Sequence, residues 1–326
     1  MDYQHLKNQA NTRVTLDAIG SWPATQHYWE EEALYAIIAA LASKRPLLIQ
    51  GKPGTGKSQL AHAAAHLLQR VFLSEVIQAD TEASQLLWSI DYTQRLADAQ
   101  MSAFDEHARD KVGKVENYIG AGVLWWALDW ESAKNQYSQH NFVPPQCYYP
   151  ENSSTVRIDN GCVLLIDEID KADISLANSL LEVLGNRRFQ VPVLGKTIPE
   201  PRTTGENALP PVEPLIILTS NGNRQLPAAL LRRCVVLELS LPEDLEAHFC
   251  KLGKTHYPET KEKILKQAAE QIIKDRASCK SHIATGLAEY LDLLSALHAI
   301  SPEAEQQAEW LEHLSAYFYK SNAEIQ

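Results

Sequence analysis

The sequence lacks the cysteine patterns that mark disulfide frameworks and zinc sites. Its five cysteines are an odd number and include no C-x-x-C pair. It also lacks any apolar run near the ~20 residues of a membrane span, and its first residues show no apolar signal-peptide core. We therefore expect a soluble protein of the reducing cytoplasm, without a membrane anchor.

Positive charge is scarce as well. The chain has 30 Lys and Arg against 41 Asp and Glu, a formal net charge of −11. Because nucleic-acid binding normally needs a basic surface, this balance makes nucleic acid an unlikely partner. The rest of the composition is that of an ordinary folded protein, and 326 residues suffice for one large core and a second, smaller one.

Short apolar segments alternate with helical patterns over the first three quarters of the chain. Strands are expected at 46–50, 71–76, 162–166 and 215–219, a hairpin at 188–198, and helices at 28–41, 59–68, 82–88, about 98–118 and 174–184. Strands that are apolar throughout favour a parallel sheet with helices on both faces. From Leu241 onward only helical patterns follow. The prediction is an α/β domain, residues 1–240, and a small all-α domain, residues 241–326.

Residues 129–158 break this pattern with a Pro-Pro pair and Asn-containing turns, so they are interpreted as an insert. Aromatic side chains crowd in and just before it: Trp125, Trp126, Trp130, Tyr137, Phe142, Tyr148 and Tyr149. Two interpretations stay open. The aromatics fill a core under a long loop, or they form a partner surface, since aromatic residues are frequent in interface hot spots.

The clearest motif is Gly-Lys-Pro-Gly-Thr-Gly-Lys-Ser at 51–58, which satisfies G-x-x-x-x-G-K-[ST] between an expected strand and an expected helix. Glycines in such a loop let main-chain N–H groups surround phosphates at the start of the helix. Lys57 is expected to contact the β- and γ-phosphates of ATP, and Ser58 to ligate Mg²⁺. The residues expected to bind the nucleotide are Gly51, Pro53, Gly54, Thr55, Gly56, Lys57, Ser58 and Gln59. A glycine turn without chemical purpose is the weaker alternative.

Two carboxylates end the apolar segment Val163–Ile166, at the edge of the sheet where open α/β proteins bind ligands. Asp167 is expected to hold Mg²⁺ through water, and Glu168 to orient and deprotonate the attacking water. A buried strand can also end in an Asp-Glu pair that is merely solvated. The position of this pair, ~110 residues after the phosphate loop, favours the catalytic interpretation.

Two further motifs are weaker when taken alone. Asn221 ends the segment Leu218–Asn221 and could hold the attacking water, although an Asn before a Gly is commonly a turn residue. Arg232 and Arg233 end a short helical pattern, where cations are also favoured by the helix dipole.

Taken in order, GKPGTGKS, VLLIDEID, LTSN and ALLRRC resemble the motifs of the AAA+ ATPases, which have a P-loop NTPase sheet followed by a helical lid. Gly122-Val123-Leu124 with Ala127-Leu128, and the stretch from Asn160 to Leu184, resemble the MoxR branch and the related dynein-like and McrB-like group. The resemblance covers roughly residues 30–300.

The resemblance implies roles for the weaker motifs. Asn221 would be the sensor-1 residue, and Arg233, or else Arg232, would be an arginine finger that reaches the ATP of a neighbouring subunit in a homo-oligomeric, usually hexameric, ring. The lid of this family normally supplies a sensor-2 arginine. Here only Arg276 and Lys280 are candidates.

Two functions of different classes remain open. One is a ring-forming motor or chaperone that remodels a protein partner, as MoxR-like proteins are thought to act on partners with von Willebrand factor A domains. The other is a slow, ATP-dependent assembly or signalling switch of a bacterial conflict or defence system. Glu168 favours real hydrolysis, whereas the uncertain sensor 2 and the insert keep the switch open. A McrB-like nucleic-acid translocase is disfavoured by the acidity of the chain.

Overall fold

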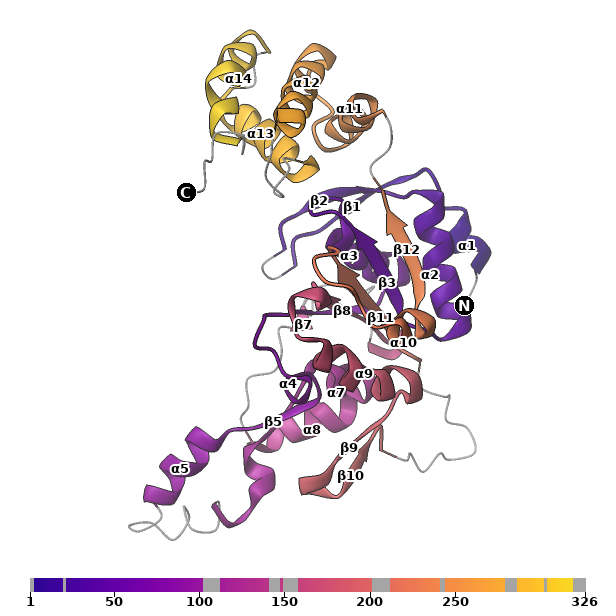
Figure 1. The fold of residues 1–326 in the computed structure, drawn as a ribbon, viewed down its shortest axis with the longest axis vertical. Helices are drawn as coiled ribbons and strands as arrows, with labels where there is room; N and C mark the ends of the chain where they lie inside the picture. The colour runs from indigo at the N-terminus through magenta and orange to yellow at the C-terminus, as the bar shows by residue number, and fades with distance from the viewer. Residues whose placement is uncertain are drawn as a thin grey trace.

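The computed structural model describes residues 3–19, 22–101, 112–140, 147–148, 158–200, 212–240, 244–278, 286–301 and 304–318. Figure 1 shows an elongated molecule with a twisted sheet in its middle. One end consists of the C-terminal helices, without strands among the described residues, and the opposite end is an arm that carries α5. None of the helices in these ranges combines the length and the apolar character that crossing a membrane requires.

The main sheet has six strands in the order β12-β3-β11-β8-β4-β7. The strands are β3 (Leu47–Gly51), β4 (Val71–Val76), β7 (Cys147–Tyr148), β8 (Cys162–Asp167), β11 (Leu215–Ser220) and β12 (Val235–Leu239). The first five strands of that order are parallel, and only β7 at the edge is antiparallel. The predicted parallel sheet is therefore confirmed.

Alternate residues of each central strand enter two different cores, because successive side chains of a strand point to opposite faces. Leu47 and Ile49 pack with α2 (Glu31–Ser43) and α3 (Lys57–Leu68) on one face. Leu48 packs on the other face with α7 (Val123–Leu128) and α9 (Ile174–Asn186). Both faces are thus covered by helices, which is why the central strands β3, β8 and β11 are apolar until their C-terminal residues.

The remaining elements of the α/β part are short. Three two-stranded antiparallel sheets pair β1 (Arg13–Leu16) with β2 (Thr25–Tyr28), β5 (Trp88–Ile90) with β6 (Ile119–Ala121), and β9 (Phe189–Val191) with β10 (Lys196–Ile198). The helices are α1 (Tyr3–Lys7), α4 (Ala83–Leu87), α5 (Tyr92–Met101), α8 (Trp130–His140) and α10 (Ala228–Arg233), with 3₁₀ turns at Val115–Tyr118, Ile158–Asn160, Ile169–Lys171 and Pro192–Leu194.

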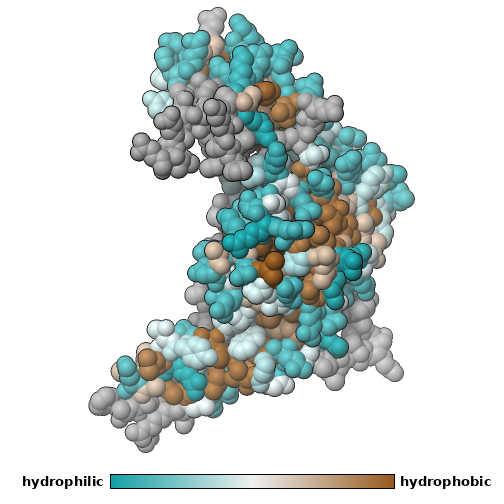
Figure 2. All heavy atoms as spheres, viewed as in Figure 1, coloured by the Kyte–Doolittle hydropathy of each residue, from teal (hydrophilic) through white to brown (hydrophobic). Residues whose placement is uncertain are grey.

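The C-terminal part is helical, as predicted, and has a core of its own. It consists of α11 (Leu245–His256), α12 (Glu262–Ser278), α13 (Leu287–Ile300) and α14 (Ala304–Phe318). Phe249, Leu265, Tyr290 and Leu294 are among its buried residues. In Figure 2, this end of the molecule is mostly hydrophilic on its surface, and hydrophobic residues gather on the middle of the molecule, where β12 and α2 lie.

Several local predictions were wrong. Tyr28 ends strand β2, so the helix expected from that residue begins at Glu31. The helix expected over about 98–118 is, within the described residues, α5 at Tyr92–Met101 and a 3₁₀ turn at Val115–Tyr118. Strand β12 was not predicted, because it is an edge strand whose Val236 and Glu238 are exposed between more buried neighbours.

The aromatic segment begins with regular structure, because α8 covers its first part. Trp125 and Trp126 are buried, and Trp130 and Tyr137 pack against the same core from α8. For these four residues the structure supports the core interpretation. Phe142 and Tyr149 lie outside the described residues.

Candidate functional site

The phosphate-loop motif connects the end of β3 to the start of α3. Gly56 precedes the helix with φ 83° and Gly54 has φ 77°, a left-handed backbone that glycine adopts without strain. At Gly51 the end of β12 comes so close that a Cβ would lie 2.5 Å from the main-chain oxygen of Leu239. The sequence therefore needs glycine here for two separate reasons, loop conformation and strand packing.

Lys57 opens helix α3 and is only 6% exposed. Its Nζ donates hydrogen bonds to the main-chain oxygens of Gly51 and Lys52, both at 2.8 Å. Burial lowers the pKa of Lys57, and the carboxylate of Asp167 opposes that effect. The ammonium group is thus held inside the loop by neutral carbonyls, which leaves its charge available to an anion.

Ser58 and Asp167 meet at the C-terminal edge of the sheet. The Ser58 hydroxyl donates to both carboxylate oxygens of Asp167, at 3.0 and 2.9 Å. Thr219, on the neighbouring strand β11, donates its hydroxyl to the same carboxylate and accepts the main-chain N–H of Glu168 at 2.8 Å. A hydroxyl and a carboxylate are oxygen donors of the kind that Mg²⁺ takes beside substrate phosphates and water, so the residues present fit that ion.

Both carboxylate oxygens of Glu168 are engaged. Oε1 accepts a hydrogen bond from the side-chain amide of Asn221 at 2.9 Å, and Oε2 forms an ion pair with Lys171. The Asn221 main chain is itself held by the buried carboxylate of Asp170, which accepts the N–H groups of Asn221 at 3.1 Å and Asn223 at 2.8 Å. Asp170 and Lys171 lie inside the motifs quoted above, but the sequence did not show that they position the acid and the amide.

The phosphate loop and the polar residues at the ends of β8 and β11 line one cavity of about 310 Å³. Its walls are Pro53, Gly54, Gly56, Lys57, Ser58 and Gln59 of the loop, Asp167, Glu168 and Asn221 of the strand ends, and Leu287, Ala288 and Leu291 of α13. The helical part therefore closes one side of the site. A Cβ at Gly54 would lie 3.7 Å from the main-chain nitrogen of Ala288.

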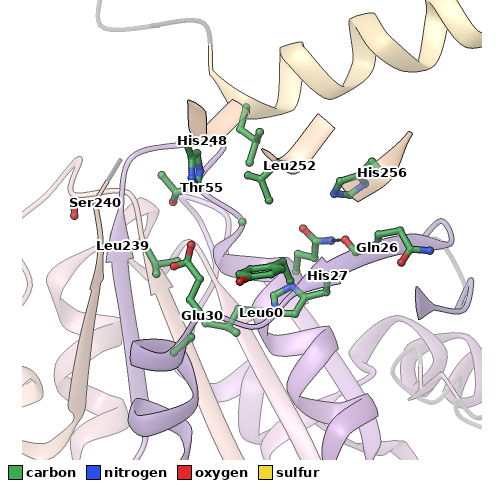
Figure 3. A pocket seen from close by; sticks show the side chains of 15 residues that line it. Gln26, His27, Glu30, Thr55, Leu60, Leu239, Ser240, His248, Leu252 and His256 are labelled. Atoms are coloured by element: carbon green, nitrogen blue, oxygen red, sulfur yellow. Dashed lines mark hydrogen bonds between the residues drawn. The ribbon is translucent and has the colours of Figure 1, made fainter. Parts of the chain in front are cut away.

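A second cavity of about 270 Å³ adjoins the first, since Gly56, Gln59 and Leu287 line both. In Figure 3, the side chains of α11 and of β2 face this cavity from opposite sides. His248, Leu252 and His256 are four residues apart on α11 and so share one face of that helix. Across from them lies His27 of β2, among residues from the hairpin, α3 and the end of β12.

The surroundings of the imidazoles in this second cavity favour their neutral form. Burial, with help from His256, lowers the pKa of His27 to about 4. Burial also lowers the pKa of His248 and of His256. The walls of this cavity are apolar, imidazole and uncharged polar side chains, with the single carboxylate of Glu30. Such walls next to a phosphate loop fit a heterocyclic base, which has both apolar faces and hydrogen-bonding edges. No motif pointed to these residues, because they come from opposite ends of the chain.

Arg232 and Arg233 are not at this site. They are exposed at the end of α10, where Arg45 binds the main-chain oxygens of both residues. The strand that follows starts beside Pro46, the residue before β3, whereas the phosphate loop starts at the other end of β3. Five residues of strand span ~16 Å, so neither guanidinium group is placed to reach the loop of its own chain.

The two sensor-2 candidates differ in what the structure shows. The guanidinium group of Arg276 lies near Gly286, at the start of α13. A Cβ at Gly286 would lie 3.9 Å from Nη1 of Arg276 and 3.8 Å from the main-chain oxygen of Pro53. Arg276 thus lies beside the phosphate loop. Lys280 lies outside the described residues.

The chain is similar to one protein family and to several solved structures. A model of the AAA domain, dynein-related subfamily, matches residues 46–234. Among solved structures, the chain is similar to the RuvB Holliday junction branch migration motor of Thermotoga maritima, at 14% identity and a TM-score of 0.45, over 87% of this chain and 67% of that one. It is also similar to a proposed ATPase from Cytophaga hutchinsonii, at 13% identity and a TM-score of 0.36, over 82% of this chain and 57% of that one. No curated protein matches it.

Proposed function

The chain belongs to the AAA domain family, in its dynein-related subfamily, and from that premise we propose that it binds and hydrolyses ATP with Mg²⁺. One observation carries the proposal. The buried ammonium of Lys57, the Ser58–Asp167 pair and the Glu168–Asn221 pair all line one cavity, which adjoins a second cavity with mostly uncharged walls.

Each residue then has a defined task. The main-chain N–H groups of the loop and Lys57 bind the phosphates, and Ser58 and Asp167 hold the metal ion, which supplies charge neutralisation at the transferred phosphoryl group. Asn221 orients a water molecule, and Glu168 takes its proton. Because Lys171 pairs with Glu168 in the structure, Glu168 must release that partner before it acts as a base.

The base is proposed to occupy the second cavity, between β2 and α11. Its binding would add to the direct contacts that hold the helical part against the α/β part. These include a hydrogen bond from Arg13 to the Thr255 hydroxyl at 3.3 Å and the Lys251 ammonium 3.9 Å from the centre of the Tyr28 ring. Arg276, beside the start of α13, is proposed as the residue that senses the nucleotide from the helical side.

We further propose that the active unit is a homo-oligomer, as a hexameric ring, in which Arg233 reaches the nucleotide of a neighbouring subunit. The position of Arg232 and Arg233, far from the loop of their own chain, supports action on a neighbour. A MoxR-like role, remodelling of a protein partner with a von Willebrand factor A domain, is the biological function that we propose for this ring.

One observation favours the slow switch as a second candidate. Both oxygens of Glu168 are occupied by side chains of the same subunit, so the base is held in a resting state. A subunit that binds ATP but rarely frees Glu168 from Lys171 would hydrolyse ATP slowly. It would suit an assembly switch controlled by ATP binding better than a motor driven by continuous hydrolysis.

The proposal is tested by ATP binding and steady-state phosphate release, with a matched pair of lysine variants. Lys57→Ala removes the buried charge and should abolish ATP binding, whereas Lys52→Ala removes an exposed charge of the same loop and should leave it nearly unchanged. Equal ATP affinity of native and Lys57→Ala protein would refute the phosphate-binding assignment. Turnover of the native chain distinguishes a motor, which hydrolyses continuously, from the switch.

A further inference from the structure

A third cavity lies at the opposite end of the sheet from the nucleotide site. It has a volume of about 510 Å³, within the range of small-molecule pockets. Its cationic residues come from loops that meet at the N-terminal ends of the strands: Lys44 lies shortly before β3, Arg70 directly before β4, and Arg187 directly after α9. The motifs and the proposed ATPase do not use any of these residues.

Arg70 is the unusual member of this group. It is only 4% exposed, and within the described residues its guanidinium group makes one hydrogen bond, from Nη1 to the main-chain oxygen of Glu213 at 3.2 Å. Its Nε is buried without a partner, and no carboxylate among the described residues forms an ion pair with it. Burial is the main cause that lowers the pKa of Arg70; Cys162 and Tyr3 act against it, and Arg187 acts with it. A buried guanidinium without an anionic partner is costly, and an anion in the cavity would compensate it.

The other charges of the cavity do not neutralise Arg70. The single carboxylate in the described lining, Glu213, forms an ion pair with Arg187 at 2.8 Å and lies 4.0 Å from the Lys44 ammonium. Three cations against one carboxylate leave two positive charges in the lining of a protein whose net charge is −11. Most of the remaining wall is apolar, formed by Tyr3, Ala40, Leu41, Leu68, Val212, Pro214 and Leu215.

We propose that this cavity is a binding site for a phosphate monoester that carries a small apolar group. A phosphate dianion matches the two excess charges, and its oxygens accept the forked N–H donors of a guanidinium group better than a single carboxylate does. The apolar walls would cover the organic part of the molecule, which inorganic phosphate lacks.

The probes are phenyl phosphate, inorganic phosphate and benzoate, titrated by calorimetry into the full-length Lys57→Ala protein, so that the phosphate loop does not compete. Phenyl phosphate should bind most tightly, inorganic phosphate more weakly because it lacks the ring, and benzoate at least about tenfold more weakly than phenyl phosphate because it carries one charge. Absence of phenyl phosphate binding, or equal binding of benzoate, would overturn the proposal.

Two variants and one control locate the site. Arg70→Met and Lys44→Glu should each weaken phenyl phosphate binding by about tenfold or more, since each removes a cation from the cavity. Arg188→Gln removes the exposed neighbour of Arg187, which does not line the cavity, and should leave binding within about twofold. If the buried Arg70 variant fails to fold, the exposed Lys44 variant decides the result. Unchanged affinity in Lys44→Glu would place the ligand elsewhere.

Discussion

At the scale of single residues, Lys171 forms an ion pair with Glu168, the residue proposed as the base. Glu168 has a left-handed backbone, φ 59°, in a turn that brings its side chain between Lys171 and Asn221. Both carboxylate oxygens of Glu168 are therefore engaged, and if Glu168 is the base, the strength of its ion pair with Lys171 would set how often it is free to accept a proton.

Lys171→Ala should raise ATP turnover by roughly two- to fivefold, because the base no longer has to break an exposed ion pair of modest strength. The gain should shrink at high ionic strength, which screens the pair in the native protein. Lys196→Ala, which removes an exposed ion pair with Glu200 away from the site, is the control and should not change turnover. Slower turnover of Lys171→Ala would instead mean that Lys171 supports catalysis.

The buried imidazole of His27 gives stability a pH dependence. Its pKa in the folded protein is about 4, below the 6.5 of an unfolded chain, so between these values the unfolded chain binds the extra proton. Stability should be complete above pH 6.5 and fall as the pH drops toward 4, by at most about 3 kcal/mol from this residue. Urea unfolding between pH 7.5 and 5 should show a smaller loss for His27→Gln than for the native chain. Parallel curves would exclude His27 as the source.

At the scale of secondary-structure elements, the phosphate loop depends on the contact between the ends of β3 and β12. Gly51→Ala would place a Cβ 2.5 Å from the Leu239 main-chain oxygen, so the two strand ends must separate. We expect a loss of roughly 1–3 kcal/mol in unfolding free energy, together with weaker ATP binding. Gly195→Ala is the control, since its φ of 62° is unfavourable but no atom lies within 4 Å of the added Cβ. A loss no larger than that of the control would show that β12 adapts at little cost.

The parts of the fold and of the site that the sequence predicts are those marked by a pattern within one short segment. The buried strands β3, β8 and β11 are apolar until their C-terminal residues, and the catalytic candidates Asp167, Glu168 and Asn221 stand at the ends of two of them. Both the parallel sheet and the position of these candidates could therefore be predicted from the sequence. Strand β2, with the polar sequence Thr-Gln-His-Tyr, gave no such signal. The second cavity could not be predicted either, because His27 and His256 meet only through tertiary packing.

At the scale of the whole molecule, the complete catalytic site is proposed to need two subunits. Glu168→Gln should bind ATP without turnover, and Arg233→Ala should lose about 10³–10⁵ in rate. Each variant retains the part that the other lacks, so mixing the two inactive proteins should restore measurable activity at composite sites. Arg232→Ala in place of Arg233→Ala is the matched control, and on its own should stay active.

The mixing experiment requires that mixed oligomers be confirmed by native mass spectrometry. Given such oligomers and an active Arg232→Ala protein, no recovery would count against action of Arg233 on a neighbour. Full activity of the Arg233→Ala protein on its own would reject Arg233 as an arginine finger. Arg233 would then be only a cation that stabilises the end of α10.

The two adjoining cavities have walls from both the α/β part and the helices α11 and α13. Under the proposed function, a nucleotide in both cavities would contact the α/β part and the helical part at once. Loss of one phosphate would then remove contacts at the end where Ala288 lies over the loop. Any change of angle between the two parts that followed would move α14, the outermost helix in Figure 1, farther than the residues beside the site.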